Sequence, residues 1–290
     1  MFSGSMVAIV TPFKNGKLDE TSLRRLIDRQ IENGTQVIVP CGTTGESATL
    51  THSEHDLVIQ ITVEHVAKRV KVLAGTGSNA THEAIRLHQS AKKIGADGSL
   101  QITPYYNKPT QEGLYQHFKA VAASSDLPII LYNVPGRTAV NMLPETVVRL
   151  SQIDTIVGIK EASGSLEQAK KIIDFCPQTF SLLSGEDAQT LDMLKLGAKG
   201  AISVTANVVP KECFLEWDYF QKGQIKKAEE MHQKLMPLHG AMFIETNPIP
   251  VKASLAMMGL IEEEYRLPLV GLSKSNRVKL QSVLKEYQLI

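Results

Sequence analysis

The chain has 290 residues, of which 43% are hydrophobic and 21% are charged, and its formal net charge is +1. This composition is typical of a globular protein with one barrel-sized domain or two smaller ones. A nearly neutral chain lacks the excess of basic residues that neutralises phosphates, which argues against nucleic acid or an anionic membrane as a partner.

The three cysteines, Cys41, Cys176 and Cys213, are odd in number, widely spaced and without a CxxC pair. This pattern argues against a disulfide framework or a zinc site, so we expect reduced thiols. The apolar run over residues 6–10 is too short for a signal peptide, and no stretch approaches the roughly 20 apolar residues of a membrane span. The sequence therefore predicts a cytoplasmic protein without a membrane partner.

Eight short runs of β-forming residues alternate with longer runs that have the periodicity of amphipathic helices. The predicted strands cover residues 6–11, 36–39, 70–74, 98–103, 128–132, 155–160, 179–184 and 200–204. Their spacing of roughly 20 to 35 residues fits one strand–helix unit each. Such alternation predicts an α/β fold with a parallel sheet inside a layer of helices, and eight units predict closure into a (β/α)8 TIM barrel.

Local signals mark helix ends and the end of the barrel. An apolar stripe in the first helical run ends at Gly34, and Thr51 with Glu54 forms a capping box ahead of the next helix. After about residue 225 the β-forming runs stop, and the remaining chain has helical character. We therefore predict a catalytic barrel over residues 1–225 and a C-terminal helical extension over residues 226–290 that packs on it.

Polar or glycine-rich segments follow each predicted strand. They are residues 11–12 (TP), 41–46 (CGTTGE), 75–79 (GTGSN), 103–107 (TPYYN), 132–137 (YNVPGR), 160–164 (KEASG), 184–187 (SGED) and 204–207 (VTAN). In a barrel of parallel strands these segments gather at one face, where the active sites of this fold are built. The sequence therefore predicts a functional site at the carboxyl ends of the strands.

Lys160 is the most informative residue of these segments. The strand period of two places Ile156, Gly158 and Lys160 on one face and the apolar Val157 and Ile159 on the other. The apolar face packs on helices, so Lys160 points into the barrel mouth, where Gly158 leaves room for it. Partial removal from water favours the free amine, a nucleophile toward carbonyl groups. The alternative is a lysine that reaches solvent from a strand end.

Three neighbouring features fit a carbonyl chemistry. Tyr132 shares a strand face with Ile130 and suits proton relay, although it could also be a core aromatic residue. The segment 42–45 (GTTG) offers successive amides for a carboxylate, or is an ordinary turn. Arg137 follows a rigid Pro-Gly turn and suits a bidentate clamp on a second carboxylate, or is a surface arginine.

One glycine-rich motif resembles a dinucleotide-binding site but does not fit it. The glycines and alanine of Gly75-x-Gly77-x-x-Ala80, with Asp97 about 20 residues further on, superficially match the dinucleotide fingerprint. The motif follows the third strand rather than the first, and Asp97 precedes the next strand instead of ending it. We therefore expect no dinucleotide.

Together these residues resemble the dihydrodipicolinate synthase / N-acetylneuraminate lyase superfamily. The matching motifs are residues 42–46 (GTTGE), Tyr132-Asn-x-Pro-x-Arg137 and Gly158-Ile-Lys160-Glu-Ala-Ser. The resemblance runs from residues 4–12 (GSMVAIVTP) to residues 247–252 (NPIPVK), which is nearly the whole chain.

The resemblance implies a Schiff-base-forming lyase that condenses pyruvate with L-aspartate 4-semialdehyde to 4-hydroxy-tetrahydrodipicolinate, on the diaminopimelate and lysine pathway. Lys160 would carry the pyruvate imine and then its enamine, and Tyr132 would pass protons to and from the reacting centre. Thr43 would link Tyr132 to Tyr106, which would enter the site of a neighbouring subunit. The family is commonly a homotetramer, a dimer of tight dimers.

The resemblance also implies roles in substrate binding. Thr44 and nearby backbone would hold the pyruvate carboxylate, and Arg137 would receive the carboxylate of the semialdehyde. Gly185 and Ile202 would line the pocket with their backbone. No metal or organic cofactor is implied.

Two other functions stay open. A pyruvate-dependent aldolase for N-acetylneuraminate or a 2-keto-3-deoxy sugar acid needs the same Lys160 and Tyr132 but not Arg137. Arg137 and the pair Tyr105 and Tyr106 favour the synthase branch of the superfamily. A barrel that has lost catalysis and senses a small acid is the third alternative, and the intact set of lysine, tyrosine and threonine argues against it.

A second site would bind L-lysine as a feedback inhibitor. The positions that match the lysine-sensitive members are Ser47, Ala48, His52, His55, Asn79, Glu83 and Tyr105. His52 and His55 are three apart on one helix and so share a face, Glu83 offers a carboxylate to an ammonium group, and Asn79 is a predicted N-cap. Without the resemblance, two solvated histidines and a surface glutamate would be the alternative.

Overall fold

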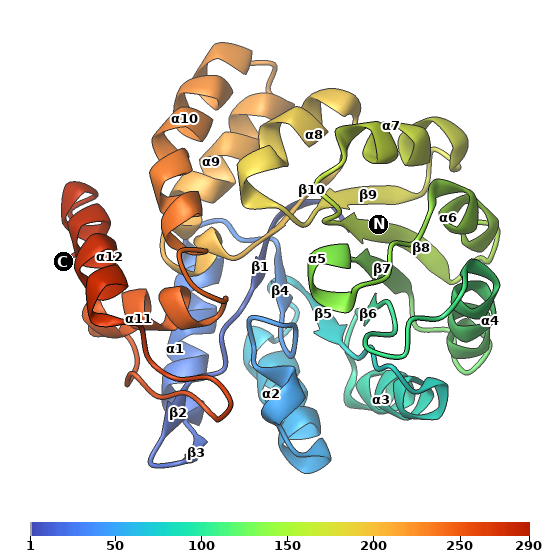
Figure 1. The fold of residues 1–290 in the computed structure, drawn as a ribbon, viewed down its shortest axis with the longest axis horizontal. Helices are drawn as coiled ribbons and strands as arrows, with labels where there is room; N and C mark the ends of the chain where they lie inside the picture. The colour runs from blue at the N-terminus through green and yellow to red at the C-terminus, as the bar shows by residue number, and fades with distance from the viewer. Residues whose placement is uncertain (1) are drawn as a thin grey trace.

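In the computed structural model, which describes residues 2–290, eight parallel strands close into a barrel surrounded by helices (Figure 1). The strands are β1 (Gly4–Ala8), β4 (Val37–Val39), β5 (Lys71–Gly75), β6 (Gly98–Ile102), β7 (Ile129–Asn133), β8 (Ile156–Glu161), β9 (Ser181–Ser184) and β10 (Gly200–Ser203). Around the barrel they follow the order β1-β10-β9-β8-β7-β6-β5-β4, and β4 closes on β1. The predicted (β/α)8 TIM barrel is therefore confirmed, and every predicted strand is present.

The first strand begins and ends earlier than predicted. The prediction covered residues 6–11, whereas β1 is Gly4–Ala8. The side chain of Asn207 accounts for the early end, because its Nδ2 donates to the Ala8 carbonyl at 2.8 Å and its Oδ1 accepts from the Val10 amide at 3.1 Å. A side chain that follows the neighbouring strand β10 thus binds the backbone of β1 where the strand ends.

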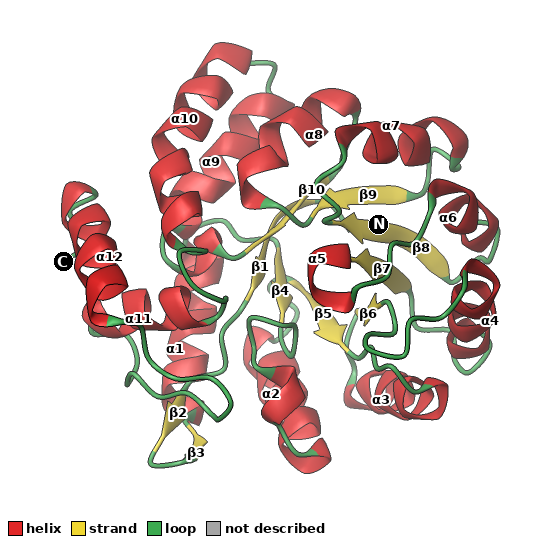
Figure 2. Ribbon diagram, in the orientation of Figure 1, coloured by secondary structure: helices red, strands yellow, loops and turns green. Residues whose placement is uncertain are grey.

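Helices cover the outside of the barrel (Figure 2). They are α1 (Glu20–Glu32), α2 (His52–Val66), α3 (Thr81–Ile94), α4 (Gln111–Ala122), α6 (Pro144–Leu150), α7 (Leu166–Phe175), α8 (Thr190–Leu196) and α9 (Pro210–Gln221). The predicted capping box is confirmed, since Thr51 and Glu54 exchange side-chain-to-amide hydrogen bonds at the start of α2. Gly34 follows α1 with a φ of +92°, as expected for a residue that ends a helix. Within residues 2–290, no helix is both long and apolar enough to cross a bilayer.

A two-stranded hairpin between β1 and α1 was missed by the sequence prediction. β2 (Phe13–Lys14) pairs antiparallel with β3 (Lys17–Leu18). Asn15 and Gly16 connect them with φ angles of +53° and +76°. Two positive φ angles suit the Asn-Gly turn that hairpins prefer, so this dipeptide was the available signal.

The chain after the barrel forms three helices, α10 (Ile225–Ala241), α11 (Ile249–Met257) and α12 (Lys274–Glu286). α10 packs along α9, and α12 packs on α10 and α11 (Figure 1). Leu280 and Leu284 of α12 are buried in the same hydrophobic cluster as Val7 of β1. This part of the chain is therefore helical and continuous with the barrel core, and the division into domains at residue 225 stays a prediction.

Apolar side chains fill the interior of the barrel. They include Met6, Val37, Leu73, Leu100, Ile130, Leu183 and Ile202, all buried in one cluster. The barrel is thus a packed core rather than a channel, as is usual for this fold. Space for a ligand is found above this core, at the carboxyl ends of the strands.

Candidate active site

Lys160 and Tyr132 lie side by side at the ends of two neighbouring strands. The register of β7 and β8 pairs Tyr132 with Lys160. Both side chains are buried, with 5% of Lys160 and 7% of Tyr132 exposed, and the Lys160 Nζ lies 4.4 Å from the centre of the Tyr132 ring. The face of a phenol ring attracts a cation, so this contact holds the amine at the ring.

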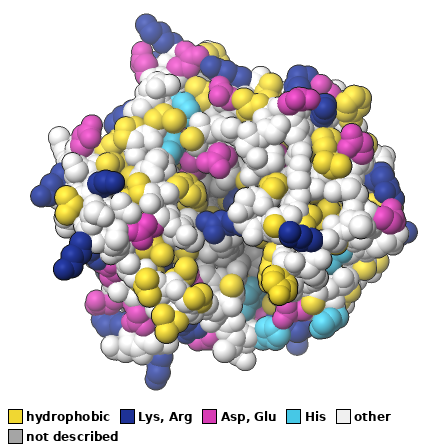
Figure 3. Space-filling model, in the orientation of Figure 1, with side chains coloured by type: hydrophobic (Ala, Val, Ile, Leu, Met, Phe, Trp, Pro, Cys, Tyr) yellow, Lys and Arg dark blue, Asp and Glu magenta, His cyan; other side chains and the backbone are white. Residues whose placement is uncertain are grey.

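These two residues line a pocket of about 580 Å³, including its open mouth. Its polar lining residues come from the ends of several strands and from the C-terminal region, and they are Thr43, Thr44, Tyr132, Arg137, Lys160, Glu186 and Asn247. Figure 3 shows a hollow near the middle of this face in which basic and acidic side chains gather. The predicted site at the carboxyl ends of the strands therefore corresponds to an open pocket.

Gly185, rather than Gly158, makes room for the Lys160 side chain. A Cβ on Gly185 would lie 2.9 Å from Cε of Lys160 and 2.8 Å from Cβ of Ala162. A Cβ on Gly158 would instead lie 2.4 Å from the carbonyl oxygen of Ser181, so Gly158 permits the close approach of β8 and β9. The expectation that Gly158 leaves space for Lys160 is therefore wrong, because Gly185 is the glycine beside the Lys160 side chain.

The loop after β4 presents free amides to the pocket. The amides of Gly45 and Glu46 bond back to Gly42 and Thr43 at 3.0 and 3.1 Å. The amides of Thr43 and Thr44 have no protein acceptor anywhere in residues 2–290, and both residues line the pocket. Two successive unpaired N–H groups form a site that suits a carboxylate.

Asn247 completes the pocket and was given no role from the sequence. It lies just before α11 and is buried, and its Nδ2 donates to Oγ1 of Thr44 at 3.0 Å. Arg137 Nη2 donates to the backbone oxygen of Asn247 at 3.2 Å, which places the guanidinium at the mouth. Asn247 Oδ1 is buried and has no partner in the described chain, so it is a free acceptor at the pocket.

Glu186 is a further lining residue from which the sequence analysis drew nothing. It follows Gly185 at the end of β9, and its half-buried side chain has a raised pKa, mainly because of burial and also because of Asp187. The charge of Lys160 acts in the opposite direction. A carboxyl group with a raised pKa beside the amine is suited to exchange protons there. Its position directly after a strand was the available signal.

The predicted relay residues are only partly brought together. Thr43 and Tyr132 line the same pocket, but across residues 2–290 no hydrogen bond joins them. Tyr106 is 90% exposed and does not line the pocket in one chain. Ile202 is buried inside the barrel below the pocket, and Val204 is the lining residue of its segment. The roles of Tyr106 and Ile202 stay predictions.

A second pocket adjoins the first and shares Thr43, Tyr132 and Arg137 with it. Of the residues predicted to bind lysine, this pocket is lined by Ser47, Ala48, His52, His55, Glu83 and Tyr105. The Glu83 carboxylate lies 2.8 Å from His52 Nε2 and accepts from Ser78, and these two hydrogen bonds lower its pKa. An ionised Glu83 is thus held in place at the pocket.

Two details differ from the expectation for this second pocket. Ala80, not Asn79, is the N-cap of α3, because Asn79 instead turns its side-chain amide to the Tyr105 carbonyl at 3.1 Å. His52 and His55 both line the pocket, but His55 is buried, which lowers its pKa, whereas the His52 side chain is 60% exposed.

A buried ion pair anchors the loop after β4 to the C-terminal region. Lys252 of α11 and Glu46 are both fully buried at their side chains and form a direct ion pair. The Lys252 Nζ lies 4.3 Å from the centre of the Phe13 ring, and Glu46 also accepts from the Arg266 amide at 3.2 Å. This cluster fixes the end of the loop whose amides face the pocket.

Comparison with known proteins agrees with this architecture. The model of the dihydrodipicolinate synthetase family matches residues 1–287. A relative named 4-hydroxy-tetrahydrodipicolinate synthase, from Syntrophus aciditrophicus, is 60% identical over 290 residues that cover all of both chains. The solved dihydrodipicolinate synthase of Acinetobacter baumannii, complexed with pyruvate, is 47% identical with a TM-score of 0.98 and covers 100% of both chains.

A further solved structure, of DHDPS from Cyanidioschyzon merolae with lysine bound, is 40% identical with a TM-score of 0.97 and covers 100% of this chain and 99% of its own. The family model and these relatives each cover nearly all of this chain. The chain therefore belongs to the dihydrodipicolinate synthetase family.

Proposed function

We propose that this protein condenses pyruvate with L-aspartate 4-semialdehyde through a Schiff base on Lys160, and so forms 4-hydroxy-tetrahydrodipicolinate. The observation that carries the proposal is the buried Lys160 amine over the Tyr132 ring, beside the unpaired amides of Thr43 and Thr44. The amine supplies the nucleophile, and the amides supply a site for the carboxylate of pyruvate. The name of the Syntrophus aciditrophicus relative and the pyruvate in the Acinetobacter baumannii structure support it.

The chemistry follows from this arrangement. The Lys160 amine adds to the ketone of pyruvate, and the carbinolamine loses water with a proton from Tyr132, which leaves the imine. The Tyr132 oxygen takes up a methyl proton, which gives the enamine. The enamine carbon then forms a new C–C bond to the semialdehyde carbonyl, whose oxygen receives that proton and becomes the hydroxyl. The amino group of the semialdehyde part then replaces the lysine at the imine carbon, which closes the ring and frees Lys160. One water is released in total.

Arg137 supplies selection for the second substrate. Its guanidinium lies at the mouth and bonds to the backbone of Asn247, which leaves further N–H donors for a carboxylate. A semialdehyde that enters after pyruvate would meet Arg137 with its own carboxylate and direct its aldehyde toward Lys160. A sugar-acid aldolase has no need of this charge.

Borohydride reduction with pyruvate tests the Schiff base, and steady-state turnover with both substrates tests the condensation. We expect a stable adduct that peptide mass analysis places on Lys160, with no adduct in Lys160→Arg and an unchanged adduct in the exposed control Lys195→Arg. An adduct without condensation would indicate a sugar-acid aldolase. No adduct at all would contradict the lyase class.

We infer that L-lysine binds the second pocket and lowers this activity. The pocket offers the ionised Glu83 to an ammonium group and adjoins the catalytic pocket through Thr43 and Tyr132. The lysine-bound DHDPS from Cyanidioschyzon merolae supports the inference. We expect millimolar L-lysine to slow the wild type and to have a weaker effect on Glu83→Gln, and an unchanged wild-type rate would contradict it.

We further propose that the chain forms a homotetramer in the cytoplasm, in which Tyr106 enters a neighbouring site. The 90% exposure of Tyr106, beside the half-exposed Tyr105, fits a residue that another subunit covers. Analytical ultracentrifugation gives the assembly. A Tyr106→Ala variant that keeps the assembly but turns over slowly would support the shared site, and unchanged turnover would contradict it.

A further inference from the structure

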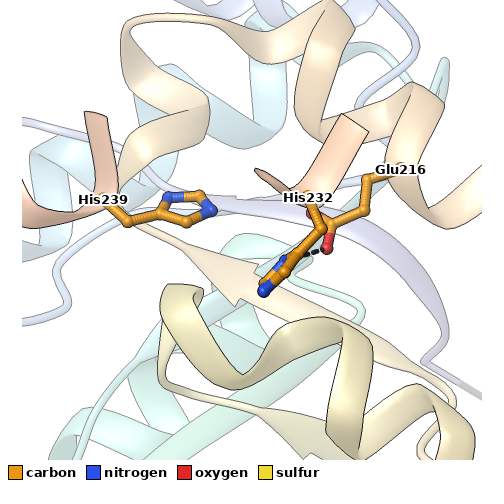
Figure 4. Close-up of side chains that lie close together, drawn as sticks. All are labelled: Glu216, His232 and His239. Carbon is orange, nitrogen blue, oxygen red and sulfur yellow. Dashed lines mark hydrogen bonds and ion pairs between the residues drawn. The ribbon is translucent and has the colours of Figure 1, made fainter. Parts of the chain in front are cut away.

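A buried group of three possible metal ligands lies away from the catalytic pocket, between α9 and α10 (Figure 4). Glu216 comes from α9, and His232 and His239 come from α10. All three are buried, and their ligand atoms lie within 4.8 Å of one another. The two histidines are separated by about two helical turns, so they share one face of α10.

The hydrogen bonds of His239 determine where its proton lies. The Thr205 hydroxyl donates to Oδ2 of Asp187 at 3.0 Å, because a carboxylate oxygen can only accept. The same hydroxyl oxygen lies 2.9 Å from Nδ1 of His239 and must therefore accept from it. These two contacts place a proton on Nδ1 of His239, and burial lowers the pKa of the ring, which disfavours a second proton on Nε2.

The other ring nitrogen of His239, Nε2, carries a lone pair that no donor in residues 2–290 satisfies. Nε2 is buried and makes no hydrogen bond with any residue in the range 2–290. Figure 4 shows the His239 ring facing the side chains of His232 and Glu216. A buried Nε2 without a hydrogen bond lowers the stability of the folded protein, unless a donor or a metal ion binds its lone pair.

His232 is already paired with Glu216 beside His239. Its Nδ1 lies 2.7 Å from Oε1 of Glu216, so an imidazole nitrogen and a carboxylate oxygen lie next to each other there. An ion that took the place of the proton between them would have both groups as ligands.

We propose that Glu216, His232 and His239 bind one divalent transition-metal ion, with zinc as the best match. Two imidazole nitrogens and one carboxylate oxygen are a donor set that zinc prefers, and a water would supply the fourth ligand. The pair of Thr205 and Asp187 would hold the His239 ring from outside. The expectation of no metal rested on the cysteine pattern and on the family resemblance, and neither of these concerned Glu216, His232 and His239.

The ion would connect the outer helices to the edge of the active site. It would join α9 to α10, and through His239 and Thr205 it would reach Asp187, which follows the pocket-lining Glu186. Asp187 also accepts from the amides of Val204 and Thr205 at 3.0 and 2.9 Å. The site would thus stabilise the ends of β9 and β10 without taking part in the chemistry.

Zinc competition with a chromophoric chelator tests the proposal on the full chain after its metal has been stripped. We expect one zinc per chain and a visible absorption band when cobalt replaces zinc. Glu216→Gln and His239→Gln should lose the site, and Thr205→Val, which removes an outer contact, should weaken binding about 10- to 100-fold. The control is His82→Gln, since His82 is exposed and outside the group.

Thermal unfolding provides a second measurement. Zinc should raise the midpoint of the wild type and of His82→Gln, with reversal by EDTA, but not that of His239→Gln. If the wild type does not bind one zinc ion tightly, the proposal is overturned, whatever the variants do. The buried group would then be explained as a His232–Glu216 ion pair. Equal binding by the wild type and by folded Glu216→Gln and His239→Gln also overturns it.

Discussion

The molecule contains two buried lysines that both lie over an aromatic ring but differ in their ionic partners. Lys252 is fully buried, is paired with Glu46 and lies over the Phe13 ring. Lys160 is 5% exposed, lines an open pocket, and has no carboxylate within ion-pair distance in residues 2–290. A buried charge with a partner is held as a charge, whereas an amine without one is available as a nucleophile. Burial alone therefore does not mark a catalytic lysine, and the missing partner does.

The largest expected effect tests the unpaired lysine. Replacing Lys160 by Ala removes the only lysine amine that lines the pocket in the described chain, so turnover should fall by more than about 10⁴-fold, the scale seen when a catalytic nucleophile is deleted. Steady-state rates with pyruvate and the semialdehyde measure it, and the unfolding midpoint should stay near that of the wild type. If Lys160→Ala kept a tenth of the wild-type activity, Lys160 would not be the catalytic nucleophile.

Replacing the paired lysine, Lys252, should lower the stability of the protein rather than its catalytic activity. Lys252→Met leaves the Glu46 carboxylate buried without its partner, and we expect a loss of about 3–5 kcal/mol in the free energy of unfolding. Denaturant titration measures this, and the folded fraction should still form the pyruvate adduct on Lys160. Adding Glu46→Gln to Lys252→Met should recover part of the loss. An equally stable Lys252→Met would show that the pair contributes little.

Arg137 gives an intermediate case, a cation at the pocket mouth that is neither paired nor buried. Arg137→Ala should lower kcat/KM for the semialdehyde about 10- to 150-fold, which corresponds to about 1.5–3 kcal/mol for a hydrogen bond to a charged group. Trapping of pyruvate by borohydride should be unaffected, because the carboxylate site at Thr43 and Thr44 is intact. If trapping fell in parallel with turnover, Arg137 would act on the first substrate.

The smallest effect concerns the surroundings of the Lys252 pair. Arg266 donates to Glu46 and forms an ion pair with Glu54, and with the capping bonds of Thr51 this lowers the pKa of Glu54 to about 2. Because the folded pKa lies below the ordinary value of 4.5, the stability from Glu54 is present above that value and is lost as the pH falls toward 2. Glu54→Gln should flatten this part of the stability profile in urea titrations at successive pH values, and an unchanged slope would contradict the assignment.

The sequence by itself determined the fold and the direction of the main catalytic side chains. Eight alternating units predicted the closed barrel, and the period of two along residues 155–160 predicted that Lys160 points inward. Tyr132 followed from the same periodicity on the neighbouring strand, and the register of β7 and β8 pairs the two. These properties are local, because a strand's period and a glycine-rich strand end can be read within a few residues.

Only the tertiary structure decided which distant groups complete the site. Asn247 bonds to Thr44 across 203 residues, and Lys252 pairs with Glu46 across 206. No local pattern marks such partners, since each depends on how the C-terminal helices pack on the barrel. The same holds for Gly185, which is recognised by the atoms a Cβ would meet. Glu216, His232 and His239 likewise lie close together because α9 and α10 pack side by side, which places a carboxylate from one helix against imidazoles from the other.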